Sequence, residues 1–161
     1  MGTRLNAWCL FQVLLLGLGI SATAAVAEVS VNIQSLPTLA APVEGAFVGS
    51  DGEVLIVAGG ESEEGLSAHV SVLAADGARW QTSRLEVPIA HGVTATTADG
   101  MICLGGVDRS GPTTRVMRLR WDGAALLQEP LPELPTPRLE AAAAVLDGIL
   151  YVTGGRPAVD A

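Results

Sequence analysis

The sequence predicts an all-β fold built from short antiparallel hairpins. Nineteen glycines and nine prolines among 161 residues indicate a chain that turns often. No apolar pattern with a helical period is present beyond the N-terminal segment. Three apolar stretches, at 54–60, 101–106 and 149–155, each end in a glycine pair, which indicates a repeating unit of strands.

The N-terminal segment 1–27 has the layout of a secretory signal. It contains one charge, at Arg4, followed by an uncharged stretch and then small residues that end at Ala27. This order is typical of a signal peptide that is cleaved near Ala27. The uncharged stretch is also long enough to span a bilayer, so a retained anchor is the alternative. We expect a periplasmic or secreted protein in which residues 28–35 form a linker.

Charge and cysteine content exclude several classes of function. The formal net charge is −8, and all nine basic residues are arginines. An acidic chain without basic clusters is not expected to bind nucleic acid or an anionic membrane, so membrane contact is expected only through the signal segment. Cys9 lies in that segment, and Cys103 lies in an apolar run where a small buried hydrophobic residue is expected rather than a catalytic thiol.

The glycine pairs close three copies of one layout, with the second glycines 46 and 49 residues apart. Each copy contains a proline-bearing segment, a small and apolar run, an Asp-Gly pair and a second apolar run. An Asp-Gly pair between apolar runs predicts a tight hairpin, because both turn positions require positive φ. The predicted turns are at Asp51, Asp99 and Asp147, and at Asp76 and Asp122 in a second hairpin after the first two glycine pairs.

Each complete repeat is therefore expected to hold four short strands. A four-stranded unit that recurs about every 50 residues is typical of a β-propeller blade of the kelch type. The WD40 type is disfavoured because the dipeptide Trp121-Asp122 occurs once. The predicted fold is a partial kelch-type β-propeller, with two four-stranded blades and a hairpin of a third, after the signal peptide. The repeats are 36–84, 85–130 and 131–161.

The glycine pairs have a structural explanation. We expect each pair to end the second strand of a blade where neighbouring blades crowd, so that backbone approaches backbone without a Cβ. A dinucleotide-binding turn is excluded, because no pair has the G-x-G-x-x-G spacing and no helix is predicted after it. No cofactor is predicted.

The repeats resemble those of the N-acetylneuraminate epimerase family, kelch propellers also called sialic acid mutarotases. The stretch PIAHGVTATTADGMICLGGVDRSGPTTRVMRLRWDG, at 88–123, is the most specific, and the resemblance extends from Leu36 to Arg156. It implies a sugar isomerase that interconverts the anomers of N-acetylneuraminate or a related sialic acid by general acid–base ring opening. It also implies about six blades. Missing blades or another chain would then be needed to close the ring, and the fragment alone is expected to be inactive.

The resemblance implies a catalytic glutamate and arginine in later blades, beyond Ala161, so no catalytic residue is assigned. In a propeller, the loops before each first strand and after each glycine pair face the central channel. These loops contain Glu44, Glu61, His91, Asp108, Arg109, Arg138, Glu140 and Arg156. The predicted substrate-binding residues are Glu44, His91, Arg109 and Arg138, because histidine titrates near neutrality and arginine binds carboxylates bidentately. For His91 a bond to the backbone is the alternative, and for Arg138 a structural role at the start of a blade.

No metal site is predicted. The acidic stretch ESEEG at 61–65 lacks the spaced ligands of a dedicated Ca²⁺ loop. The alternative function is a non-catalytic kelch module that binds protein or glycan. A radical-copper oxidase is disfavoured, because Tyr151 is the only tyrosine and lies within a predicted strand.

Overall fold

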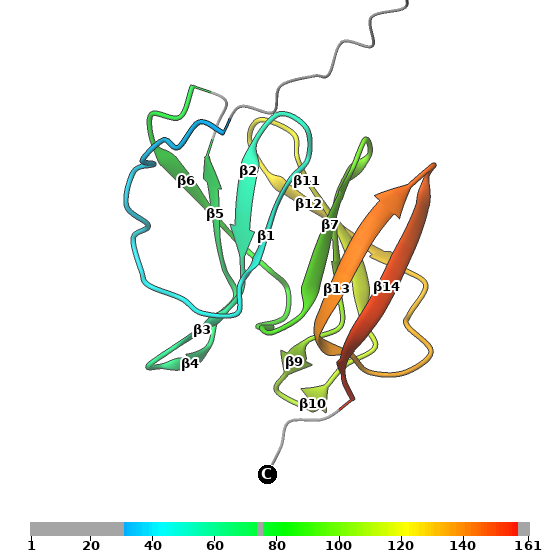
Figure 1. Ribbon diagram of the computed structural model, residues 1–161. Coiled ribbons are helices and arrows are strands. Elements are labelled where there is room, and N and C mark those ends of the chain that lie inside the picture. The colour runs from blue at the N-terminus through cyan, green and yellow to red at the C-terminus, as the bar shows by residue number, and fades with distance from the viewer. Residues whose placement is uncertain (1–30, 74–75, 158–161) are drawn as a thin grey trace, which may run out of the picture. The chain divides into compact units, whose positions relative to one another are not determined.

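A computed structural model describes residues 31–73 and 76–157, so the predicted signal segment 1–27 lies outside the described residues (Figure 1). The chain divides into two units, 1–34 and 35–161, and the fold described below is that of the second. Its described part is all-β, with antiparallel strands and no helix. Accordingly, none of the described residues form an apolar helix of membrane-spanning length.

Two four-stranded sheets share one strand order, in which the four strands of a sheet lie side by side in the order of the chain. The first sheet has the order β1-β2-β5-β6, with β1 at Phe47–Ser50, β2 at Leu55–Ala58, β5 at His69–Leu73 and β6 at Trp80–Arg84. The second has the order β7-β8-β11-β12, with β7 at Val93–Thr97, β8 at Gly100–Leu104, β11 at Val116–Trp121 and β12 at Leu126–Leu131. The two predicted four-stranded units are therefore present.

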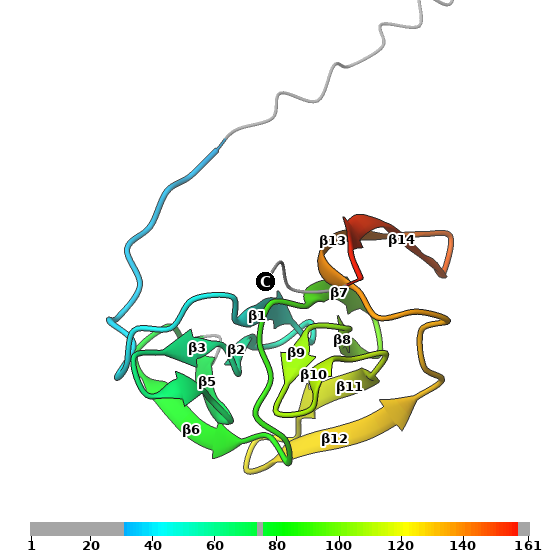
Figure 2. The same ribbon diagram turned by 90° about the horizontal axis from the view of Figure 1, so that it is seen from below.

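The third repeat forms a hairpin of β13 at Leu139–Leu146 and β14 at Ile149–Arg156. Two small ribbons follow the first two glycine pairs and were not predicted. They are formed by β3 at Glu61–Ser62 with β4 at Gly65–Leu66, and by β9 at Val107–Asp108 with β10 at Gly111–Pro112. The first strands of the three repeats, β1, β7 and β13, are neighbours, while β6 and β12 lie on the opposite side (Figure 2).

Hairpins turn at all five predicted Asp-Gly pairs, which confirms their positions. The predicted turn conformation is wrong at four of them, because only Asp147 combines with its glycine to give positive φ at both residues. At Asp51 and Asp122 the loop has four residues, and the carboxylate accepts hydrogen bonds from backbone N–H groups two and three positions on. Aspartate therefore serves there as an acceptor and not as a left-handed residue.

Apolar side chains fill the space between the two four-stranded sheets and the space between the second sheet and the hairpin. The larger cluster joins the first sheet to the second, and its buried members include Phe47, Ile56, Val72, Met101 and Leu119. The smaller cluster joins the second sheet to the hairpin, with Ile102, Leu104 and Val116 buried against Ala143, Leu150 and Val152. The second sheet thus buries both of its faces, and burial of this apolar area is the main force that stacks the repeats.

Candidate functional site

The same backbone bridge occurs at one edge of each repeat, and it joins a residue at or shortly before the start of the first strand to the residue after the glycine pair. The bridged pairs are Glu44 with Glu61, Ala90 with Val107, and Leu139 with Arg156. Side chains from distant parts of one repeat therefore meet at this edge. The sequence places charged residues at several of these positions, which makes the edge the natural place to look for a site.

A left-handed residue follows each bridged residue, and these three residues form a hydrogen-bonded series. Gly45 and His91 both have a φ of 59° and Glu140 has a φ of 51°. The N–H of His91 donates to the carbonyl of Gly45 at 2.7 Å, and the N–H of Glu140 donates to the carbonyl of His91 at 2.9 Å. The repeat itself thus imposes the unusual backbone at His91 and Glu140, and these bonds offset its strain.

The glycine pairs hold this edge against the next repeat, as predicted. A Cβ on Gly59 would lie 2.2 Å from the carbonyl oxygen of Ile89, and one on Gly105 would lie 2.2 Å from that of Arg138. The second glycines, Gly60 and Gly106, donate their N–H groups to these same two carbonyls. The expected close approach of backbone to backbone is confirmed for the first two pairs.

His91, Glu61 and Glu44 form the first polar cluster of the edge. The Nε2 atom of His91 lies 3.1 Å from Oε2 of Glu61, and one ligand atom from each of the three side chains lies within 4.8 Å of the others. The side chain of His91 is 27% exposed and that of Glu61 is 42% exposed, so both groups are open to solvent. The His91 ring rests over Gly45, where a Cβ would lie 2.4 Å from Nδ1.

A second pair lies beside the first cluster. Nη2 of Arg156 donates to Oε1 of Glu140 at 3.1 Å. A cavity of about 280 Å³ brings this pair together with the histidine, and its lining consists of Glu61, Leu66, His91, Val107, Leu139, Glu140 and Arg156. The cavity therefore presents an imidazole, two carboxylates and a guanidinium around a small apolar floor, a set able to bind an anion and to transfer protons.

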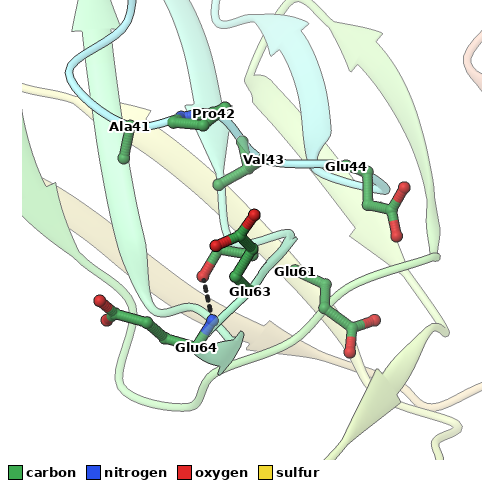
Figure 3. Close-up of a pocket in the computed structure, with 8 residues that line it drawn as sticks. Ala41, Pro42, Val43, Glu44, Glu61, Glu63 and Glu64 are labelled. Atoms are coloured by element: carbon green, nitrogen blue, oxygen red, sulfur yellow. Dashed lines mark hydrogen bonds between the residues drawn. The ribbon is translucent and has the colours of Figure 1, made fainter.

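Glu61 also borders a wider hollow of about 730 Å³ on the first repeat, together with Glu44, Glu63 and Glu64 (Figure 3). The side chains of Glu44 and Glu61 extend to one side of this hollow, while Glu63 and Glu64 point elsewhere. The acidic stretch at 61–65 is therefore not one cluster. Glu44 and Glu61 belong to the cluster with His91, whereas Glu63 and Glu64 lie outside it.

Of the four predicted substrate-binding residues, two meet in the cluster and two lie elsewhere. Glu44 and His91 are neighbours around Glu61. Arg138 donates from Nη1 to the carbonyl of Gly154 at 3.3 Å, the structural role that the sequence left as its alternative. Arg109 is exposed in the turn between β9 and β10 and lines neither hollow.

Glu61, Glu140 and Arg156 are the residues that the sequence did not select, although all three are in the predicted channel-facing loops. The repeat register could have identified them. Glu61 and Arg156 each follow a glycine pair, and Glu140 occupies the position in the third repeat that His91 occupies in the second. The repeat register predicts where a side chain lies along the edge, but it does not predict which side chain it contacts. Which side chains pair across the edge depends on the stacking of one repeat on the next.

Cys103 is excluded as a nucleophile within the folded chain. Its side chain is buried in the cluster between the two sheets, as the sequence predicted, and burial raises the pKa of the Cys103 thiol far above its usual range. The thiol therefore stays protonated near neutral pH. Chemistry at this edge belongs to imidazole, carboxylate and guanidinium groups.

Comparison with known proteins gives two partial relatives. No protein-family model matches the chain. The chain is similar to N-acetylneuraminate epimerase from Brucella suis, with 30% identity over an alignment that covers 61% of this chain and 31% of the relative. It is also similar to N-acetylneuraminate epimerase from Brucella melitensis biotype 1, with 31% identity covering 54% of this chain and 27% of the relative. The chain thus spans about a third of the length of the curated relatives it matches.

Proposed function

We propose that this chain is part of a kelch-type β-propeller of the N-acetylneuraminate epimerase family, and that the complete protein interconverts the anomers of N-acetylneuraminate or a related sialic acid. The names of the two Brucella relatives support the family. Two stacked sheets of identical strand order, with their first strands adjacent, support the propeller. We further propose export, on the strength of the signal-like segment 1–27.

The reaction needs one base and one acid. A base removes the proton of the anomeric hydroxyl, and the electrons of that O–H bond form a carbonyl as the bond between the anomeric carbon and the ring oxygen breaks. An acid protonates the departing ring oxygen. Closure on the other face reverses both proton transfers, so the sugar regains its composition and no cofactor is consumed.

The cavity that holds His91, Glu61 and Arg156 together is the observation that most favours this function. An imidazole in contact with a carboxylate is a pair of groups suited to general acid–base work. A guanidinium in the same cavity suits the carboxylate of a sugar acid. In this proposal Arg156 takes the role that the sequence suggested for Arg109 and Arg138, and Glu44 lines the wider hollow beside the cavity. The glutamate and arginine that the resemblance implies in later repeats stay unassigned.

The test uses the complete protein that contains this chain. Exchange between the two anomers of N-acetylneuraminate is followed by NMR, with and without protein. We expect catalysed exchange, reduced about 100-fold by His91→Asn, because one positioned acid–base group typically contributes 10²–10⁴-fold. Arg156→Gln should mainly raise the KM, since it weakens carboxylate binding. His69→Asn is the matched control, because His69 lies on β5 and lines neither hollow.

Two outcomes oppose the proposal. Exchange at the uncatalysed rate, combined with retention of the protein on an immobilised glycan or protein partner, would favour the non-catalytic kelch module. Catalysis that is unaffected by His91→Asn and Arg156→Gln would place the chemistry in another part of the protein, and this edge would then lose its proposed role.

A further inference from the structure

We infer that Glu44, Glu61 and His91 form a binding site for a divalent transition-metal ion, with Zn²⁺ as the best-matched probe. The site lies at the edge where the first and second repeats meet, and it shares His91 and Glu61 with the proposed sugar cavity. Three side chains from separate segments bring one imidazole nitrogen and two carboxylate oxygens to within 4.8 Å of one another. Mixed nitrogen and oxygen donors of this kind suit Zn²⁺ and its neighbours, whereas Ca²⁺ and Mg²⁺ prefer oxygen alone.

The distances within the cluster suit a small metal ion. In a tetrahedral zinc site with bonds of about 2.0–2.2 Å, two ligand atoms lie about 3.4 Å apart. Nε2 of His91 and Oε2 of Glu61 are already 3.1 Å apart. The widest separation, within 4.8 Å, closes by rotation of the exposed Glu44 side chain.

The charges of the three ligands also suit a divalent cation. As metal ligands, two carboxylates bring two negative charges and an imidazole brings none, which balances a doubly charged cation. Nε2 of His91 contacts Oε2 of Glu61, and a carboxylate oxygen of Glu44 lies within 4.8 Å of both side chains' ligand atoms. A metal ion would therefore relieve the repulsion between two close carboxylates.

The fold holds the histidine in place for this role. The ring occupies the space above Gly45 that a Cβ would fill, and the backbone of His91 is fixed on both sides by hydrogen bonds to Gly45 and Glu140. Glu61 is fixed by its bridge to Glu44, whose N–H and carbonyl are both bonded to Glu61. Three protein ligands are typical of zinc sites that keep a fourth position for water or a substrate. The ligands thus come from backbone that is already ordered.

The experiment titrates ZnCl₂ into the tag-free full chain, in the absence of sugar, by calorimetry. We expect one ion per chain, and at least about tenfold weaker binding in His91→Asn and in Glu61→Gln, because even residues outside the ligand set typically change metal affinity 10–100-fold. His91→Gly is the second variant, since the first repeat has glycine at this left-handed position. Co²⁺ bound in place of Zn²⁺ should give visible absorption bands that are lost in both His91 variants.

Two controls separate this site from a general acidic surface. Glu63→Gln and Glu64→Gln remove the same charge as Glu61→Gln, but these side chains point away from the cluster (Figure 3). They should leave the Zn²⁺ affinity within about twofold, as should His69→Asn, because His69 lies on β5 outside the cluster. Gly45→Ala should weaken binding, because its Cβ would displace the imidazole.

The inference is overturned if Glu63→Gln weakens binding as much as His91→Asn, or if Ca²⁺ binds as tightly as Zn²⁺. Absence of stoichiometric Zn²⁺ binding by the folded chain, with folding checked by circular dichroism, overturns it as well. Failure of this inference is distinguishable from failure of the proposed isomerase, because the titration contains no sugar and measures metal binding alone. Conversely, loss of the proposed isomerase activity would leave a measured Zn²⁺ site intact.

Discussion

Strands β8 and β14 occupy the same place in successive repeats, yet one is buried on both faces and the other is largely exposed. All five residues of β8 are buried, whereas β14 alternates between exposed and partly buried positions. Both strands are apolar and both lead to a glycine pair. Local sequence therefore makes both segments strands, and the neighbours of each strand decide how deeply it is buried.

The difference comes from stacking. Met101 and Cys103 of β8 face the first sheet, while Ile102 and Leu104 face the hairpin. In the described part of the chain β14 pairs with β13 alone, and Tyr151, which corresponds to Ile102, is 52% exposed. Successive side chains of a strand point to opposite faces of its sheet. A strand therefore buries all its side chains only when another layer packs on each face.

The largest effect is expected from the glycine pairs. Gly105→Ala should destabilise the fold by about 4 kcal/mol, because left-handed backbone costs an alanine about 1–2 kcal/mol and overpacking about 1–3 kcal/mol more. Gly154 has a similar φ of 67°, but nothing lies within 4 Å of its Cβ position. Gly154→Ala should therefore cost only the backbone term, about 1–2 kcal/mol. Denaturant unfolding of both variants measures the difference, and equal losses would contradict the stacking argument.

A smaller effect is expected from the matched apolar pair. Ile102→Ala removes a side chain buried between the second sheet and the hairpin and should cost about 3 kcal/mol. Tyr151→Ala removes a half-exposed ring and should cost less than about 1 kcal/mol. Urea midpoints of the two variants provide the comparison. If Tyr151→Ala were the more damaging change, β14 would have to be covered in solution.

The smallest effect is expected at two Asp-Gly turns in which the aspartate has different roles. Asp122 accepts hydrogen bonds from the N–H groups of Ala124 and Ala125, and these bonds lower the pKa of its carboxyl. Asp147 instead adopts a φ of 51° in a two-residue turn. Asp122→Asn should therefore reduce stability at neutral pH, whereas Asp147→Asn should not, since asparagine tolerates left-handed backbone.

The pH dependence gives the sign of the Asp122 effect. A carboxyl whose pKa is lowered by folding stabilises the fold above its unfolded pKa of about 3.9, and this stabilisation is lost as the pH falls through the lower folded pKa. The stability difference between the native protein and Asp122→Asn should thus shrink on acidification below about pH 4. A difference that stays constant across this range would show that the lost contribution is not the ionised carboxylate.

The sequence by itself determined the strands of the two four-stranded sheets and the hairpin, the positions of the five turns, the repeat and the burial of Cys103, because each depends on local periodicity, turn residues or hydrophobicity. It also placed Glu44 and His91 at one edge through the repeat register. Only the tertiary structure decided that His91 contacts Glu61, that Glu140 contacts Arg156, and that Arg138 supports the hairpin instead of the cavity. These partners lie 16 to 30 residues apart in the chain and meet through bridges and stacking between segments, and no local pattern records such contacts.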